Sequence, residues 1–217
     1  RSFESNLINK EEVYKLLALA ECLSIPVLLV GPPGTAKTAT VIDYTKGMFD
    51  LTDQAQVDHF NNEGVFMLET DEGTKASEIK GVVNLEKLVT DNKYELDSHI
   101  TKADTVIINE VDKASSSLRN SLLGIMNEKV LFNGKDKIPC NWKLFVATCN
   151  EIPKEEEKNP FWDRFALKMT VNRLGAGDLI KYYKNGGKDY KGTIKVKVPT
   201  RADIDAVNVP HDKLEKF

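Results

Sequence analysis

Hydrophobic positions along the chain form short continuous runs that alternate with stretches of helical spacing. The continuous runs predict buried strands of a parallel sheet, and they lie at residues 25–30, 64–68, 105–108, 143–148 and 166–171. Residues 9–23 and 115–128 carry apolar side chains at helical spacing, and another helix is expected to end near Lys46. Strands that alternate with helices indicate an α/β fold with a parallel sheet.

Two segments interrupt this alternation. Residues 74–96 have mixed polarity with short alternating pieces at 81–85 and 93–96, which predict an insertion that contains a small hairpin. Residues 130–134 predict a turn-containing ribbon. At the start of the first helix, Asn9 is the expected N-cap, since acidic residues follow it in the first turn.

The composition changes after Arg173, where glycines and lysines become frequent, so we expect a boundary near residue 173. Residues 194–198 alternate in polarity and predict a strand. Residues 173–217 hold ten Lys and Arg against six Asp and Glu, in a chain whose net charge is −3. This basic segment could face nucleic acid. A solvated surface is the alternative, and we favour it.

Composition places the chain among soluble globular proteins, with 41% hydrophobic and 29% charged residues in 217. No apolar run approaches the roughly 20 residues that cross a bilayer, and residues 1–6 lack the apolar core of a signal peptide. The cysteines, Cys22, Cys140 and Cys149, have neither disulfide nor metal-ligand spacing. We therefore expect buried cysteines in a reducing cytoplasm.

A phosphate-binding loop pattern follows the run at 25–30, and it consists of Gly31, Pro32, Pro33, Gly34, Thr35, Ala36, Lys37 and Thr38. In such a loop, backbone N–H groups turn inward around phosphate oxygens and a helix N-terminus points at the anion. Lys37 is expected to contact the β- and γ-phosphates and Thr38 to ligate Mg²⁺. Ala36 replaces the usual second glycine and is small enough for the loop to close. The pattern predicts binding of ATP with Mg²⁺.

Polar residues follow two of the other predicted strands. Glu110 is placed to polarise the attacking water. The position before it, where an aspartate is expected to hold Mg²⁺ through water, is Asn109. Its neutral amide can bond a metal-bound water but lacks the charge, so nucleotide binding should survive while metal affinity and turnover are open questions. Asn150 could orient the water beside the γ-phosphate, although a turn-forming Asn is the alternative.

In this order, residues 31–38, 106–114, 144–151 and 161–165 resemble the AAA+ ATPases. Residues 77–81, 109–114, 122–128 and 129–134 are more narrowly similar to the MoxR branch. The resemblance implies a P-loop three-layer sandwich with a central parallel five-stranded sheet. It also implies a nucleotide-binding core over residues 1–172, with the insertion at about 74–96, and a reduced or truncated lid over residues 173–217.

The same resemblance implies roles for three residues outside the loop. Asn150 is similar to the first sensor, and Arg201 is placed like the second sensor of the lid. Arg164 resembles the arginine finger, which reaches the γ-phosphate bound in a neighbouring subunit. The implied activity is ATP hydrolysis by a ring, expected to be a hexamer. The ring would do chaperone-like remodelling of a protein client, with a von Willebrand A-type partner.

Two alternatives remain open at the sequence level. A nucleic-acid-directed AAA+ motor rests on the basic segment at 181–201 alone. A nucleotide-gated scaffold with weak hydrolysis rests on Asn109, because the amide lacks the charge of an aspartate.

Overall fold

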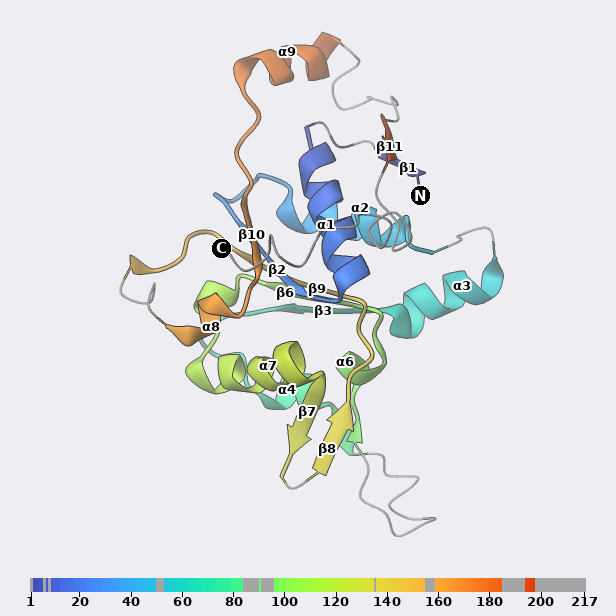
Figure 1. The fold of residues 1–217 in the computed structure, drawn as a ribbon, viewed down its shortest axis with the longest axis vertical. Coiled ribbons are helices and arrows are strands. Elements are labelled where there is room, and N and C mark those ends of the chain that lie inside the picture. Colours follow the sequence, from blue (N-terminus) through green and yellow to red (C-terminus); the bar gives the residue numbers. More distant parts are fainter. Residues whose placement is uncertain are drawn as a thin grey trace, which may run out of the picture.

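Five parallel strands form the centre of the fold (Figure 1). The computed structural model describes the chain at residues 2–5, 7, 9–49, 53–83, 90, 96–134, 136–154, 159–184 and 194–197. The strands follow the order β10-β2-β9-β6-β3, with the bounds β2 Pro26–Val30, β3 Val65–Glu69, β6 Thr105–Asn109, β9 Leu144–Cys149 and β10 Leu167–Thr170. Every pairing between them is parallel. The expected five-stranded parallel sheet is therefore confirmed.

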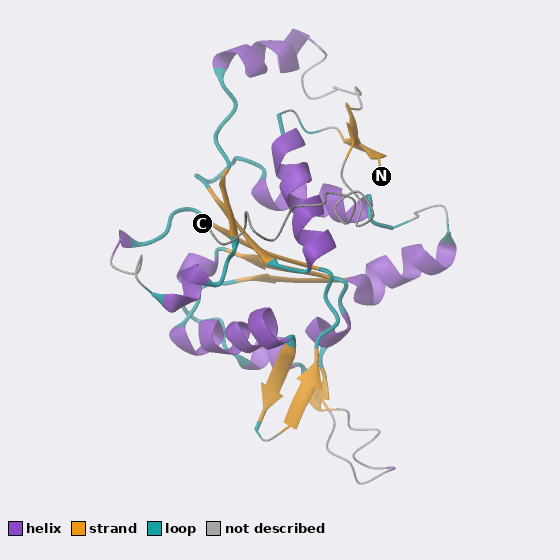
Figure 2. Cartoon of the chain, viewed as in Figure 1, coloured by secondary structure: helices purple, strands orange, loops and turns teal. Residues whose placement is uncertain are grey.

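Helices cover both faces of this sheet, which gives the expected three layers (Figure 2). One face packs against α1 Glu11–Leu23 and α2 Lys37–Lys46. The other face lies over α4 Ser77–Lys80, α6 His99–Lys102, α7 Ser116–Glu128 and α8 Pro160–Asp163. Further helical segments of the described residues are α3 Gln54–His59, a π-helical continuation at Phe60–Gly64, a 3₁₀ turn at Val111–Lys113, and α9 Ala176–Lys184.

The apolar runs of the strands contribute side chains to two hydrophobic cores, one on each face of the sheet. Along β2, Val27 and Leu29 face α1 and α2, whereas Leu28 between them belongs to the cluster around α7. In β9, Val146 and Ala147 divide between the two faces in the same way. Successive side chains of a strand point to opposite faces, so a strand buried on both faces reads as a continuous apolar run.

Among the described residues, three two-stranded sheets lie outside the central sheet. The ribbon is β7 Val130–Asn133 with β8 Asp136–Pro139. The hairpin of the insertion is β4 Val82–Val83 with β5 Leu96–Asp97. The strand expected near residues 194–198 is β11 Ile194–Lys197, and it pairs antiparallel with β1 Ser2–Ser5. The boundary near residue 173 stays a prediction.

One local prediction is wrong. The N-cap of α1 is Lys10, not Asn9, and the Lys10 side chain makes no capping hydrogen bond. Asn9 lies in the left-handed region with φ 55°, whereas an N-cap residue typically has extended dihedrals. Acidic residues in the first turn, Glu11 and Glu12, are present as expected, so the helix start is favoured by charge instead of by a side-chain cap.

The cysteines agree in part with their expected burial: Cys140 and Cys149 are buried, and Cys22 is partly exposed. Burial raises the pKa of the Cys140 thiol to about 11 and that of Cys149 to about 12, which makes both inert. Among the helices of the described stretches, none is long and apolar enough to cross a membrane.

Candidate nucleotide-binding site

The loop at residues 31–38 leaves the sheet between two neighbouring strands. Gly31 N–H donates to the carbonyl oxygen of Cys149 at 3.1 Å, on the β9 side. On the β10 side, a Cβ atom at Gly31 would lie 2.2 Å from the carbonyl oxygen of Val171. Only glycine fits this exit from β2, because any side chain would collide with backbone.

Two residues of the loop take left-handed backbone conformations. Gly34 has φ 81° and lies at the turn of the loop. Ala36, the residue before α2, has φ 61°. An L-residue in this region costs about 1 kcal/mol or more, and the missing second glycine therefore carries a conformational cost. The loop nevertheless leads directly into the N-terminus of α2, which agrees with the expectation that the small Ala36 side chain lets the loop close.

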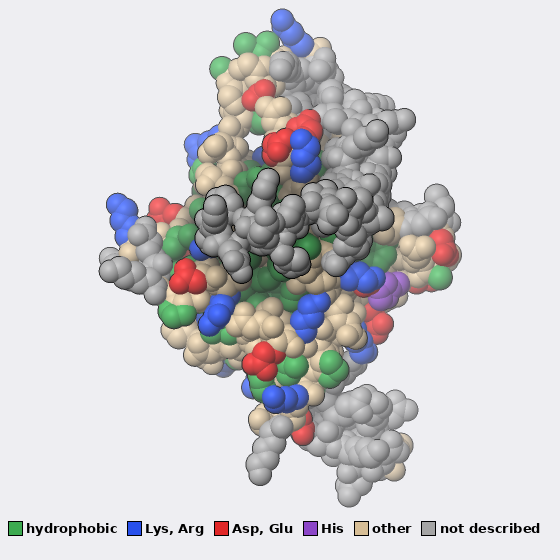
Figure 3. Space-filling model, in the orientation of Figure 1, with side chains coloured by type: hydrophobic (Ala, Val, Ile, Leu, Met, Phe, Trp, Pro, Cys, Tyr) green, Lys and Arg blue, Asp and Glu red, His purple; other side chains and the backbone are tan. Residues whose placement is uncertain are grey.

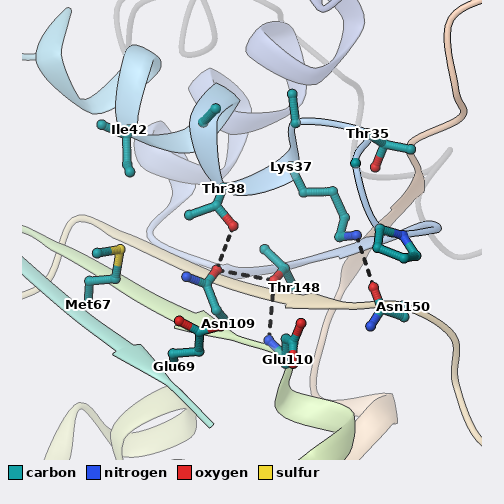
Figure 4. A pocket seen from close by; sticks show the side chains of 14 residues that line it. Thr35, Lys37, Thr38, Ile42, Met67, Glu69, Asn109, Glu110, Thr148 and Asn150 are labelled. Atoms are coloured by element: carbon teal, nitrogen blue, oxygen red, sulfur yellow. Dashed lines mark hydrogen bonds between the residues drawn. The ribbon is translucent and has the colours of Figure 1, made fainter.

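Lys37 is the first residue of α2, and its side chain folds back under the loop. Its Nζ donates to the carbonyl oxygens of Gly31 at 2.6 Å and Pro32 at 3.3 Å, and to Asn150 Oδ1 at 3.4 Å. Burial lowers the pKa of Lys37, while nearby acidic groups that include Asp112 act in the opposite direction. The ammonium group is thus held at the end of β2, beside the first-sensor candidate (Figure 4).

Asn109 is at the centre of a hydrogen-bond cluster at the ends of β6 and β9. Its Oδ1 accepts from Thr38 Oγ1 at 2.9 Å and from Thr148 Oγ1 at 3.2 Å. Glu110 N–H in turn donates to Thr148 Oγ1 at 3.4 Å (Figure 4). Asn109 is only 8% exposed, so the cluster fixes the hydroxyl of Thr38 against the end of the neighbouring strands.

Glu110 follows directly in the left-handed region, with φ 55°. Its carboxylate forms an ion pair with Lys113 in the 3₁₀ turn, and this hydrogen bond raises the pKa of Lys113. Thr70 Oγ1 approaches the carbonyl oxygens of Asn109 at 3.0 Å and Glu110 at 2.7 Å. The backbone on both sides of the carboxylate is therefore held in place.

Most of the phosphate loop and the polar residues at the strand ends line one cavity of about 440 Å³. Its lining includes the loop from Pro33 to Thr38 together with Asn109, Glu110 and Asn150. The sequence-based prediction did not include Glu69, Thr148 and Thr70. Glu69 and Thr148 also line the cavity, and they come from strand ends whose neighbours only the register of the sheet reveals. Thr70 is the residue after β3.

The donor set fits a phosphate group and a hard cation. Backbone N–H groups at a helix N-terminus and a Lys ammonium suit phosphate oxygens. The Thr38 hydroxyl and the nearby carboxylates are oxygen ligands that suit Mg²⁺, and the Asn109 amide oxygen accepts a hydrogen bond from that hydroxyl.

Arg164 lies away from this cavity. It is the C-cap of α8 and is exposed. The aromatic residues before it, Phe161 and Trp162, are 2% and 1% exposed, so the short helix is anchored in the core while its last residue faces outward. The other arginine expected at the site, Arg201, lies outside the described residues.

A buried arginine that the sequence did not single out connects α8 to the turn after Glu110. Arg119 on α7 is 7% exposed, and its Nη2 donates to the carbonyl oxygen of Asp112 at 2.8 Å. Its guanidinium lies 5.9 Å from the ring centroid of Phe161 and 5.5 Å from that of Trp162. Burial raises the pKa of Asp112, and hydrogen bonds from backbone N–H groups, one of them on Asn150, act against this shift.

Comparisons with known proteins give a family. A profile of the bpMoxR family, the MoxR domain in MoxR–vWA–β-propeller ternary systems, matches residues 1–208. Structural protein ORF618 of Acidianus two-tailed virus is 31% identical over 148 residues, which are 66% of this chain and 22% of that protein. The uncharacterised protein MJ0812 of Methanocaldococcus jannaschii is 28% identical over 168 residues, 76% of this chain and 41% of that protein.

The fold also has a solved relative. A crystal structure of a candidate ATPase from Cytophaga hutchinsonii superposes with a TM-score of 0.58 at 20% identity, covering 91% of this chain and 57% of that one. The chain thus spans well under half of the curated relatives it matches and little more than half of the solved structure.

Proposed function

Because the chain belongs to the MoxR branch of the AAA+ ATPases, we propose that it binds ATP with Mg²⁺ in the cavity at residues 31–38 and hydrolyses it. The observation that carries this proposal is the contact of Thr38 Oγ1 with Asn109 Oδ1 at 2.9 Å, beside Lys37 and Glu110 in one cavity. This contact joins the phosphate loop to the strand end that bears the acidic residue.

The side chains then have separate roles. Lys37 holds the β- and γ-phosphate oxygens once its Nζ leaves the carbonyl oxygens of the loop. The Thr38 hydroxyl would ligate the metal while it keeps its hydrogen bond to Asn109 Oδ1. Mg²⁺ supplies neutralisation of phosphate charge when bound. Glu110 accepts a proton from the attacking water, and Asn150 orients that water.

Release of Glu110 from Lys113 is a requirement of this mechanism. While the Glu110 carboxylate is paired with Lys113, it is not free to accept a proton from the water. The pair is an exposed one between residues three apart, and such contacts contribute little stability. The Glu110 carboxylate can therefore exchange Lys113 for the water at little cost in free energy.

We further propose that the working unit is a ring, with a hexamer as the expected form. Support comes from Arg164, which is exposed and does not line its own chain's cavity. An arginine finger in trans has this placement. In the ring, Arg164 contacts the γ-phosphate held by the neighbouring subunit.

The proposed client is a protein, and a von Willebrand A-type protein is the proposed partner. The family description, a MoxR domain of ternary systems with vWA and β-propeller components, supports this choice. The ribbon β7–β8 projects from the layer of α7, away from the central sheet (Figure 2). Such projecting elements are suited to contact a client.

A nucleic-acid-directed motor has no further support from the structure. Most of the basic segment at 181–201 lies outside the described residues. Over the described residues of the face in Figure 3, basic and acidic side chains are interspersed. A nucleic-acid surface is expected to have a basic patch or stripe.

Nucleotide binding and turnover test the proposal together. We expect the wild-type chain to bind a fluorescent ATP analogue and release phosphate, Lys37→Ala to lose binding, and Glu110→Gln to bind without turnover. A specific activity that rises with protein concentration would support the ring. If the wild type turns over ATP no faster than Glu110→Gln does, the nucleotide-gated scaffold is the better interpretation. If the wild type does not bind nucleotide, the proposal is wrong.

A further inference from the structure

Glu69 stands beside Asn109 at the edge of the proposed metal site. β3 and β6 pair in parallel, with Glu69 and Asn109 as Cα partners. Registered residues of parallel strands point to the same face, and both residues line the same cavity. Figure 4 shows the Glu69 carboxylate next to the Asn109 amide, on the side of the sheet that faces Thr38.

The hydrogen bonds of Asn109 limit what it can do for a metal. An amide oxygen has two lone pairs, and Oδ1 of Asn109 already accepts from the hydroxyls of Thr38 and Thr148. A water bound to Mg²⁺ presents its hydrogens outward and needs an acceptor. The amide NH₂ of Asn109 only donates, so Asn109 orients Thr38 and has no acceptor left for a metal-bound water.

The carboxylates of the cavity are divided between two tasks. That of Glu110 is held by Lys113 and is assigned to the water. Glu69 makes no ion pair or hydrogen bond with another described residue, and it is exposed to the cavity side. A carboxylate provides both the acceptor oxygens and the negative charge that Mg²⁺ with its retained waters prefers.

We propose that Glu69 supplies the carboxylate that holds Mg²⁺ through its water shell, in place of the aspartate expected at Asn109. The negative charge of the metal site then comes from β3 and not from β6, and the amide at position 109 serves to orient Thr38. This inference rests on the proposed nucleotide site.

The test moves the carboxylate from position 69 on β3 to position 109 on β6. Glu69→Gln, Asn109→Asp and the double variant are compared with wild type by titrating Mn²⁺, an EPR-visible stand-in for Mg²⁺, into full-length protein saturated with ADP. We expect Glu69→Gln to weaken Mn²⁺ binding about 10- to 100-fold, the usual cost of losing an outer-shell partner. The double variant restores affinity to near the wild-type value, because the carboxylate is only moved across the register pair.

Glu72→Gln is the matched control, since Glu72 is an exposed carboxylate just beyond β3 that does not line the cavity, and it should bind Mn²⁺ as wild type does. Unchanged Mn²⁺ affinity in Glu69→Gln overturns the proposal. So does weakening that the added Asn109→Asp leaves uncorrected. ADP affinity measured in EDTA distinguishes failure of the proposed nucleotide site from failure of the Glu69 assignment. If wild type does not bind ADP, the nucleotide site itself is wrong. The Glu69 assignment is judged only on variants that all bind ADP.

Discussion

Lys10 Nζ donates to the carbonyl oxygen of Thr35 at 2.9 Å, which ties the start of α1 to the tip of the phosphate loop. Both residues are buried, at 5% and 4% exposure. Burial lowers the pKa of Lys10, and the charge of Lys37 lowers it further. A desolvated ammonium next to a second cation is costly, and the negative charge of the proposed phosphate ligand would offset this cost.

We therefore expect Lys10→Met to weaken nucleotide binding about tenfold, because an unsatisfied buried carbonyl costs about 1–3 kcal/mol and loosens the loop tip. The measurement is the affinity for a fluorescent ATP analogue, taken below the melting temperature of either protein. Lys15→Met is the control, since Lys15 lies on the same helix in an exposed pair with Glu12. Equal affinities of Lys10→Met and wild type would show that the contact does not position the loop.

Ala36 offers a test of conformational strain. Its φ of 61° is unfavourable for alanine, so Ala36→Gly removes a steric cost of about 1 kcal/mol while it raises the entropy of the unfolded chain by an amount of similar size. We expect the free energy of unfolding to change by less than about 0.5 kcal/mol, or to increase. Ala39→Gly, inside α2, should destabilise by about 1 kcal/mol. Urea denaturation compares the two, and equal losses would contradict the strain at position 36.

The edge strands β3 and β10 are partly exposed, against the buried strands expected there, but the three inner strands, β2, β6 and β9, are buried on both faces, and the sequence predicted most of the fold for this reason. Their apolar runs are unbroken, and the phosphate loop begins where one of them ends. The start of α1 was predicted wrongly because Asn9 matches the cap preference, whereas in the structure the N-cap is Lys10, whose side chain is held by Thr35. A propensity cannot include a hydrogen bond to a residue that is distant in the chain.

Part of the candidate site could likewise be predicted from local sequence patterns, and part of it could not. Lys37, Thr38, Asn109, Glu110 and Asn150 were found from local patterns, and the structure brings them to one cavity. Finding Glu69 required the register of β3 against β6, which no single segment encodes. Arg119 resembles an ordinary helix-surface arginine in sequence, and only its packing against the aromatic side chains of α8 identifies it as a core residue.

Asp104 predicts an acid-sensitive contribution to stability. Burial acts to raise its pKa, but hydrogen bonds from Lys143 and His59 outweigh this effect and hold the pKa below the usual value of 3.8. Because the unfolded chain binds the proton more tightly, the stabilisation is complete above pH 3.8 and is lost as pH falls through the lowered folded-state pKa.

Asp104→Asn should accordingly lower the free energy of unfolding by about 1 kcal/mol at pH 7, a value reduced by the exposure of Lys143. The difference from wild type should shrink as the pH is lowered below about 4. Chemical denaturation at a series of pH values measures both effects. Asp136→Asn, an exposed carboxylate in β8, is the control, and a pH-independent difference at Asp104 would assign its effect to packing.

Arg119 joins the turn after Glu110 to α8, whose C-cap is Arg164, so its loss should disturb the proposed arginine finger. We expect Arg119→Gln to lower ATP turnover by about ten- to a hundredfold, since misplacing a catalytic group by about 1 Å has effects of that size. Nucleotide affinity should change little, because Arg119 does not line the cavity. Phosphate release and ADP binding measure the two quantities, with thermal unfolding to confirm that the variant is folded.

Mixed assemblies decide whether Arg119 acts on its own site or on the next one. Under the proposed mechanism, Glu110→Gln subunits lose ATP hydrolysis but keep the proposed finger, whereas Arg119→Gln subunits keep an intact acidic residue. If Arg119 acts through Arg164, mixing the two inactive proteins restores turnover, because each Arg119→Gln pocket then receives a finger from a Glu110→Gln neighbour. Arg164→Ala mixed with Glu110→Gln calibrates the experiment. Restoration there, but not with Arg119→Gln, would place the effect of Arg119 on the Glu110 turn of its own chain, through its hydrogen bond to Asp112.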